Sequence, residues 1–122
     1  MTDHIFVFNN KMERKRMRIL ITNRSIFLFK SGKDWKIVRR YSLDDLKQVV
    51  VSAKNFTLTA LKFEKGYDLL VDSYRRIDIV LYLAQRMKKA GIPLFKIVYL
   101  RNFNIRKRPI NEKKKDELKK ET

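Results

Sequence analysis

Residues 17–29 read MRILITNRSIFLF, and this stretch decides the class of fold. β-branched, aliphatic and aromatic residues fill Met17–Thr22 and Ser25–Phe29, and Asn23-Arg24 separates the two runs. Such residues favour strands, and asparagine tolerates the left-handed backbone of a tight turn. The stretch therefore predicts a β-hairpin from which the neighbouring segments can be placed.

Further strand candidates lie on both sides of this hairpin and end at polar or glycine-containing turns. They cover His4–Phe8, Trp35–Tyr41, Lys47–Ser52, Thr57–Phe63 and Tyr67–Val71. The polar stretch from Asn9 to Arg16 is typical of a loop. Ser42–Leu46 indicates a single helical turn in which a serine or aspartate caps free backbone N–H groups, which explains Asp44-Asp45 better than a catalytic or metal pair.

An amphipathic helix is predicted from Ser73 to Ala90. Its apolar residues recur at helical spacing, namely Ile77, Val80, Leu81, Ala84 and Met87. Gly91 is placed to end the helix in the left-handed conformation, and Pro93 opposes its continuation. Ile92–Leu100 is apolar enough for a packed strand or a further short helix, and the pattern does not decide between them.

These elements predict a mainly β (α+β) domain over residues 1–101, followed by a Lys/Glu-rich tail over residues 102–122. The tail is expected to be disordered alone or to order against a partner. In short alternating strands, aromatic residues are expected mostly in the core. This expectation covers Phe27, Phe29, Trp35, Phe56 and Phe63.

The charge points to an acidic partner. The chain has 30 Lys and Arg against 13 Asp and Glu, a formal net charge of +17. An anionic membrane, an acidic protein surface or a nucleic acid would all relieve this self-repulsion. The candidate anion-binding residues gather around the first hairpin: Lys11, Arg14, Lys15, Arg16, Arg18 and Arg24. The candidate partner-binding residues of the tail are Arg106, Lys107, Arg108, Lys113, Lys114 and Lys115.

Catalysis is not expected. The chain has no cysteine, one histidine and three glycines, and it shows no nucleophile with a paired base and no glycine-rich phosphate loop. No cofactor or metal site is predicted from these residues. No segment has the roughly 20 apolar residues of a membrane-spanning helix, so any membrane contact is expected to be peripheral and cytoplasmic.

Several segments resemble the class I myosin tail homology domain. They are HIFVF at residues 4–8, the basic loop that follows, ILITNRSIFLF at 19–29, RYSLDDL at 40–46 and VVVS at 49–52. The similarity covers residues 4 to about 90 and includes no motor. It implies a pleckstrin-homology-like fold, a bent seven-stranded antiparallel sandwich or barrel capped by one C-terminal helix.

The same resemblance implies a module that binds anionic phospholipid, including phosphoinositide, through the basic first hairpin loop and links the membrane to the cytoskeleton. A structural subunit of a large cytoskeletal assembly, such as a microtubule-based or ciliary one, is the alternative. There the basic surface and the tail would contact protein. RNA binding within a ribonucleoprotein rests on charge alone and is less favoured.

Overall fold

The computed structural model describes residues 1–9, 11–32, 35–102 and 105–106 of the chain. Its strands are β1 (Thr2–Phe8), β2 (Arg14–Ile21), β3 (Ser25–Lys30), β4 (Ile37–Ser42), β5 (Leu46–Ser52), β6 (Leu58–Phe63), β7 (Leu69–Asp72) and β8 (Lys96–Leu100). A 3-10 turn, η1 (Leu43–Asp45), joins β4 to β5, and the helix α1 (Arg76–Ala90) joins β7 to β8. The strands form one sheet in the order β4-β3-β2-β1-β7-β6-β5-β8.

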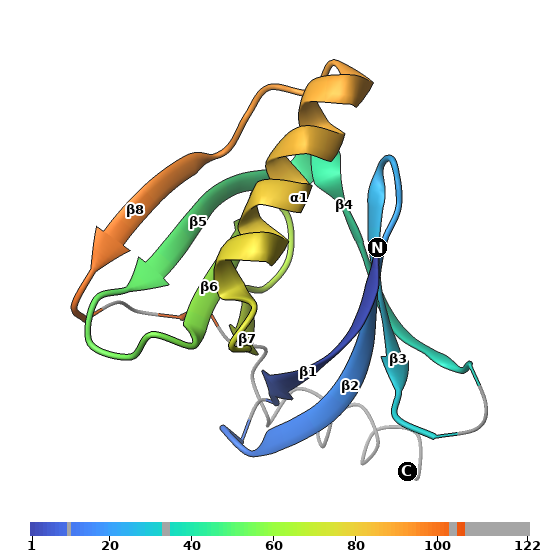
Figure 1. Ribbon diagram of the computed structural model, residues 1–122, viewed down its shortest axis with the longest axis vertical. Helices are drawn as coiled ribbons and strands as arrows, with labels where there is room; N and C mark the ends of the chain where they lie inside the picture. Colours follow the sequence, from blue (N-terminus) through green and yellow to red (C-terminus); the bar gives the residue numbers. More distant parts are fainter. Residues whose placement is uncertain (10, 33–34, 103–104, 107–122) are drawn as a thin grey trace, which may run out of the picture.

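The sheet bends so that its two halves face each other. Figure 1 shows β1–β4 on one side, β5–β8 on the other, and α1 lying across the opening between them. Aliphatic side chains from both halves and from α1 meet in the main core, among them Ile19, Leu28, Val49, Leu61 and Leu83. Burial of these apolar surfaces is the main force that holds the helix on the sheet.

The predicted hairpins are confirmed, with one correction to the first. Arg14, Lys15 and Arg16 lie in β2 and not in a loop, because β1 is long enough to pair with them from Phe8↔Arg14 onward. The connection is therefore short. Its side chain–backbone contacts are local: Asn9 Oδ1 accepts hydrogen bonds from the backbone N–H groups of Lys11 (3.0 Å) and Glu13 (2.9 Å).

The turn at Ser42–Leu46 also forms as predicted. Ser42 Oγ accepts a hydrogen bond from the Asp44 backbone N–H at 3.3 Å, which is the capping role expected of a serine at this place. The described residues contain no group of three or more His, Cys, Asp or Glu side chains that could hold a metal ion.

The helix ends where predicted but begins later. Gly91 has φ 70° and its N–H bonds to the Lys88 carbonyl, which is the left-handed stop that glycine permits. At the start, Ser73 Oγ accepts from the Arg75 N–H, so helical backbone begins only at Arg76. Within the part of the chain that the structure describes, no helix is both long and apolar enough to cross a membrane.

The predicted apolar face of the helix was partly wrong. Val80 and Met87 are buried, but Ile77 and Leu81 are each 56% exposed. The buried face instead contains Ile79 and Leu83. Helical spacing alone admits both stripes, and only the position of the bent sheet selects between them.

The segment that the sequence left ambiguous is a strand. β8 pairs parallel with β5 in continuous register from Gln48↔Lys96 to Ser52↔Leu100. The described sheet therefore has eight strands and not the seven predicted, and α1 is followed by a strand that returns to the sheet edge.

The aromatic residues divide between core and surface. Phe29 and Phe63 are buried as predicted and Phe27 is half-buried, but Trp35 (55% exposed) and Phe56 (76% exposed) are not core residues. Trp35 precedes β4, which is an edge strand, so nothing in the described sheet covers it from that side. Phe56 lies in the loop between β5 and β6.

Candidate functional site

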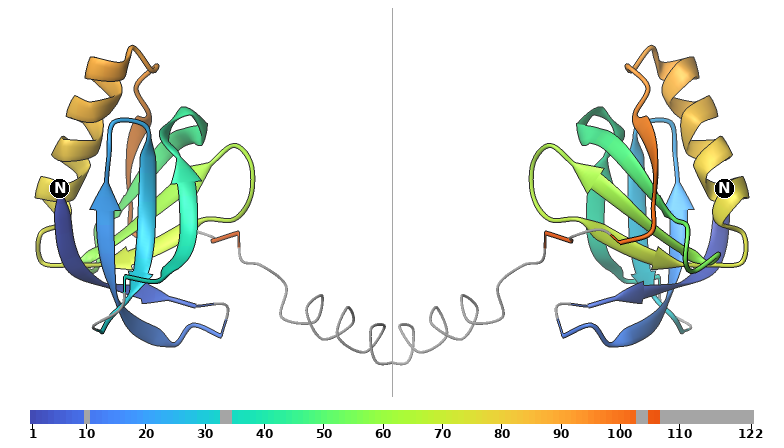
Figure 2. Two further views of the ribbon diagram at one scale, coloured as in Figure 1. Left: turned by 90° about the vertical axis from the view of Figure 1, so that its right-hand side faces the viewer. Right: turned by 90° about the vertical axis from the view of Figure 1, so that its left-hand side faces the viewer.

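Two hairpin loops lie at the same end of the molecule. Figure 2 shows the β1–β2 loop and the β3–β4 loop at the lower end, while the β2–β3 turn and the C-terminal end of α1 lie at the upper end. β1, β2, β3 and β4 are successive antiparallel neighbours, so consecutive connections lie at opposite ends and the β1–β2 and β3–β4 loops share one end. Most of the candidate anion-binding residues are at the lower end.

The side chains of β2 alternate between the two faces of the sheet. Lys15 pairs with the buried Val7, so it projects on the core side at the open end of the sheet. Arg16 pairs with Phe6 and Arg18 pairs with Phe29, and both project to the outer face together with Arg14. The basic cluster therefore extends over both faces of one strand.

Arg14 is held by intramolecular contacts. Its Nε lies 2.9 Å from Asp72 Oδ2, and its guanidinium carbon lies 3.4 Å from the centroid of the Phe6 ring. The Asp72 carboxylate offsets the charge of this guanidinium and the Phe6 ring covers one of its faces, so Arg14 is less available to a ligand than a cation without such partners. Arg14 therefore orders the outer face where β1, β2 and β7 meet.

Arg18 orders the β3–β4 loop. Its Nη2 donates to the Gly32 carbonyl at 2.8 Å, and its guanidinium carbon lies 3.8 Å from the centroid of the Trp35 ring. The Trp35 ring also meets Phe29 edge-on, with the centroids 5.1 Å apart. These contacts fix the tryptophan in place while leaving more than half of it exposed.

The remaining cations at this end are exposed and weakly engaged. Lys15 is 4.0 Å from Glu13 Oε2, the outer limit for an ion pair. In the described part of the chain, no ion pair is formed by Lys11, Arg16, Lys30 or Lys36. Their charges are therefore available to an external anion.

Exposed apolar side chains lie among these cations. Met12 is 43% exposed at the tip of the β1–β2 loop and has φ 60°, an uncommon conformation for a residue other than glycine. Trp35 and Ile37 are exposed on the β3–β4 side. We call this region the hairpin-tip surface, defined by Lys11, Met12, Lys15, Arg16, Lys30, Trp35, Lys36 and Ile37.

Arg24 does not belong to this surface. It lies in the β2–β3 turn at the opposite end of β2, where its Nη1 is 3.6 Å from Asp44 Oδ2. The neighbouring Asn23 accepts a hydrogen bond from Arg86 near the C-terminal end of α1. Arg24 is close to the other candidates in sequence, but the hairpin places it at the opposite end of the sheet from them.

Arg106 contacts the domain itself. Its backbone N–H donates to Asp68 Oδ2 at 2.8 Å, its carbonyl accepts from the Asp68 N–H at 2.9 Å, and its guanidinium bonds to the Phe63 carbonyl. Ile105 packs against a small outer-face cluster of Val50, Ala60 and Leu70. The other tail candidates, Lys107, Arg108, Lys113, Lys114 and Lys115, lie outside the described residues.

Replacing Asp68 with alanine should therefore loosen this attachment. The carboxylate is only 2% exposed and also lies 2.9 Å from Lys62 Nζ, so its loss should lower the free energy of unfolding by about 2–3 kcal/mol. Urea unfolding measures this change, and hydrogen exchange should show faster exchange of the Arg106 amide. Glu64→Ala is the control, because Glu64 is 63% exposed and 3.7 Å from Lys47, a pair worth under about 1 kcal/mol. If both substitutions lowered the free energy of unfolding equally, Asp68 would not hold Arg106 on the domain as the structure indicates.

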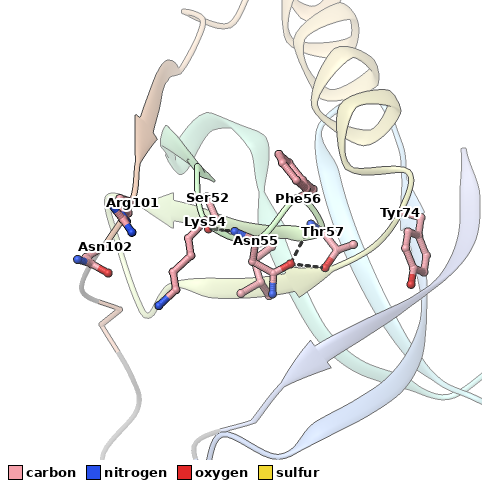
Figure 3. A pocket seen from close by; sticks show the side chains of 9 residues that line it. Ser52, Lys54, Asn55, Phe56, Thr57, Tyr74, Arg101 and Asn102 are labelled. Atoms are coloured by element: carbon pink, nitrogen blue, oxygen red, sulfur yellow. Dashed lines mark hydrogen bonds between the residues drawn. The ribbon is translucent and has the colours of Figure 1, made fainter.

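A separate hollow of about 750 Å³ lies at the β5–β6 loop. Figure 3 shows Lys54, Arg101 and Asn102 on one side and Tyr74 on the other, with Phe56 directed toward the helix. The Asn55 turn between them is closed by hydrogen bonds from the Thr57 N–H and hydroxyl to Asn55 Oδ1. The hollow opens at the C-terminal end of β8, since Arg101 and Asn102 follow that strand.

Sequence reasoning missed the apolar part of the hairpin-tip surface. Trp35 and Ile37 alternate with Lys36 in a pattern typical of a half-buried strand, and that pattern does not reveal that the strand is at the sheet edge. One usable signal was the predicted turn sequence Ser31-Gly32-Lys33-Asp34, which directly precedes Trp35.

Comparisons with known proteins show the fold. No protein-family description and no curated protein sequence matches this chain. Among solved structures, the hSac2 domain of the human phosphoinositide phosphatase Sac2 has a TM-score of 0.65 and 13% identity, covering 89% of this chain and 80% of that chain. The linker-DH/PH domains of p115-RhoGEF give a TM-score of 0.59 and 11% identity, covering 77% of this chain and 29% of theirs.

A third similar structure is inner membrane complex sub-compartment protein 3 from Toxoplasma gondii, with a TM-score of 0.56 and 19% identity. It covers 74% of this chain and 77% of that chain. At such identities these likenesses establish a shared architecture: a mostly β, pleckstrin-homology-like bent sheet with one helix. None of these three is a myosin tail domain, so the resemblance to that family stays a prediction.

Proposed function

We propose that this chain is a non-catalytic module that binds anionic membrane surfaces through the hairpin-tip surface. One observation carries the proposal. The β1–β2 and β3–β4 hairpin tips, at the same end of the sheet, present exposed lysine and arginine side chains together with an exposed tryptophan and methionine. That combination suits the boundary between lipid headgroups and acyl chains.

The electrostatic part of the proposal depends on the loosely engaged cations. Each lysine or arginine that reaches an anionic leaflet contributes roughly 1 kcal/mol. Five such residues at the tips, Lys11, Lys15, Arg16, Lys30 and Lys36, therefore supply a moderate and salt-sensitive affinity. The overall charge of +17 adds a long-range attraction that orients the approach.

The apolar part depends on Trp35 and Met12. An indole ring prefers the membrane interface, because its ring is apolar and its N–H is polar. Arg18 and Phe29 hold the ring in place before any contact is made, so binding need not order it. Met12, at the neighbouring tip, is flexible and polarizable, which suits shallow insertion.

Two similarities support an anionic lipid as the ligand. The basic first hairpin resembles that of the myosin tail homology domain, a lipid-binding module, and the similar structures include the DH/PH domains of p115-RhoGEF and a domain of a phosphoinositide phosphatase. We propose phosphoinositides as the favoured headgroup. Their clustered phosphates can be contacted by several basic side chains at once.

The test uses the fluorescence of Trp35, the chain's single tryptophan. The full chain is titrated with vesicles of phosphatidylcholine alone, with added phosphatidylserine, and with phosphatidylinositol bisphosphate at matched total charge. We expect a blue shift with both anionic compositions, tighter binding to the phosphoinositide vesicles, and affinity that falls as salt rises. Equal binding to neutral vesicles would contradict the proposal.

Sedimentation of the same mixtures separates two further outcomes. Vesicle binding without any shift in tryptophan emission would place the contact on another face of the molecule and reject the hairpin tips. A single-stranded RNA oligonucleotide that displaces the protein from vesicles at lower concentration than soluble inositol phosphates would favour nucleic acid as the ligand.

A further inference from the structure

The two edges of the described sheet differ in how they are protected. β4 has a register irregularity against β3 between Leu28 and Phe29 and carries Arg39 and Arg40, features that discourage pairing with another strand. β8 pairs with β5 in unbroken register and reads Lys-Ile-Val-Tyr-Leu, with one charge in five residues. An apolar, regular edge is a template for strand addition.

The outward edge of β8 can be identified from its pairing. The Leu100 carbonyl accepts a hydrogen bond from the Ala53 N–H, so the backbone groups of Leu100 face β5. In a parallel pair, alternate residues face alternate edges, which directs the backbone groups of Ile97 and Tyr99 away from β5. These are the groups that an added strand would bond.

Side chains on the helix side of β8 are apolar and exposed. Ile97 pairs with Val49 and Tyr99 with Val51, two core residues, so both project toward the side on which α1 lies. They are nevertheless 60% and 62% exposed. No described element covers them from beyond the sheet edge.

The exposed apolar residues of α1 lie on the flank of the helix that faces β8. On the flank facing the N-terminal half of the sheet, the Tyr82 hydroxyl accepts from the Met1 amino group and Arg86 donates to Asn23. Ile77 and Leu81 lie on the opposite flank by helical spacing, which Figure 1 shows facing β8. We call Ile77, Leu81, Ile97 and Tyr99 the α1–β8 surface.

The charges around this surface are mainly positive, and the neighbouring carboxylate of Asp78 is paired with Arg75 at 3.6 Å. Lys88 follows Ile77, Leu81 and Ala84 along the same flank of α1, Lys96 begins β8, and Arg101 follows it. Arg101 and Lys54 also line the hollow at the C-terminal end of the strand (Figure 3). An occupant with acidic side chains is favoured, whereas a second copy of this chain would bring a further charge of +17.

We infer that the α1–β8 surface binds an extended segment of a partner protein in which apolar and acidic residues alternate. The segment adds as a strand to the free edge of β8. Its apolar side chains cover Ile97, Tyr99 and the exposed flank of α1, because alternate side chains of a strand share one face. Its acidic side chains lie on the other face, near Lys96, and an acidic end reaches the hollow beside Lys54 and Arg101.

The test measures binding of a fluorescent peptide with alternating valine and glutamate to the full chain, by fluorescence anisotropy. A peptide of the same composition with valines and glutamates in separate blocks controls for charge and apolar content. A third peptide carries N-methyl groups on alternate amides, which removes strand hydrogen bonds without altering the protein. We expect the alternating peptide to bind at least about tenfold more tightly than either control, a difference of about 1.4 kcal/mol.

Two variants of the protein locate the site. Ile97→Glu should weaken binding of the alternating peptide by at least about tenfold, since it places a negative charge on the apolar face. Val38→Glu is the control at the protected edge, because Val38 is an exposed aliphatic residue of β4 (38%) outside the hairpin-tip surface, and it should leave binding unchanged. Circular dichroism checks that both variants remain folded.

Three results would overturn the inference. Equal binding of the alternating and block peptides would show that the charge and apolar content of the peptide, and not strand addition, account for the affinity. Peptide binding that survives Ile97→Glu and is lost in Val38→Glu would place the interaction at the β4 edge. If the unsubstituted chain sedimented as a dimer and the Ile97→Glu variant as a monomer, the occupant would be a second copy of the chain.

Discussion

Replacing Lys15 and Arg16 together with glutamate should weaken binding to phosphoinositide-containing vesicles by roughly a hundredfold or more. Each side chain contributes roughly 1 kcal/mol at an anionic surface, and reversing its charge converts that attraction into a comparable repulsion. The two charge reversals together weaken the binding free energy by roughly 4 kcal/mol. Each 1.4 kcal/mol of binding free energy corresponds to a tenfold change in affinity. Vesicle sedimentation with the full chain measures the loss. Both side chains are exposed, so the fold should be retained.

The matched control changes the same amount of charge at the other end of the molecule. Arg24→Glu with Lys88→Glu alters the β2–β3 turn and the C-terminal turn of α1, which lie together away from the hairpin tips (Figure 2). We expect only a few-fold loss, through the reduced net charge. If the two double variants lost affinity equally, binding would depend on total charge and the hairpin-tip surface would not be the site.

Replacing Arg76 with leucine should produce the largest loss of stability of any single substitution considered. The buried guanidinium donates from Nη1 to the carbonyls of Ser52 (3.0 Å), Asn55 (3.0 Å) and Leu58 (3.1 Å). Leucine would leave these acceptors without their donor, which should lower the free energy of unfolding by about 3 kcal/mol. For a domain of this size, the melting temperature should fall by roughly 10–20 °C. Differential scanning calorimetry measures both quantities.

The neighbouring arginine provides the control. Arg75 is 57% exposed and pairs with Asp3 at 3.0 Å and with Asp78 at 3.6 Å. Surface pairs of this kind contribute up to about 1 kcal/mol, so Arg75→Leu should shift the melting temperature by only a few degrees. A comparable loss in both variants would show that the Arg76 contacts with the β5–β6 loop contribute no special stability.

Arg76 also connects the fold to the inferred partner surface. Its three acceptors belong to the end of β5, the loop that follows, and the start of β6. The same loop carries Lys54 and Phe56 beside the hollow at the end of β8. The start of the helix is therefore bonded directly to the loop that an added strand would approach.

Much of the architecture could be predicted from residues close together in the chain. β-branched and aromatic runs predict the hairpins, Ser42 predicts the capped turn, and Gly91 predicts the end of the helix. Each depends on the backbone preferences of a few neighbouring residues, and the structure confirms each of them. The positive charge and its concentration around the first hairpin are likewise evident without any structure.

The side of the molecule that each residue faces depended on tertiary structure. Alternation predicted two faces for Trp35–Tyr41, but the edge position of β4 decides that Trp35 is exposed. Helical spacing allowed Ile77 and Leu81 in the core, yet the bent sheet buries Ile79 and Leu83 instead. In both cases the deciding contacts come from segments distant in sequence.

The basic first hairpin shows the same division. The amino-acid sequence alone is enough to show that Lys11, Arg14, Lys15, Arg16, Arg18 and Arg24 form a cluster of charge, because composition and proximity are properties of the chain. Only the folded structure separates them. Asp72 and Phe6 hold Arg14, Trp35 and Gly32 hold Arg18, and the length of β2 moves Arg24 to the far end. The reason is physical: strand pairing and ion pairs between distant segments decide which charges remain available to a ligand.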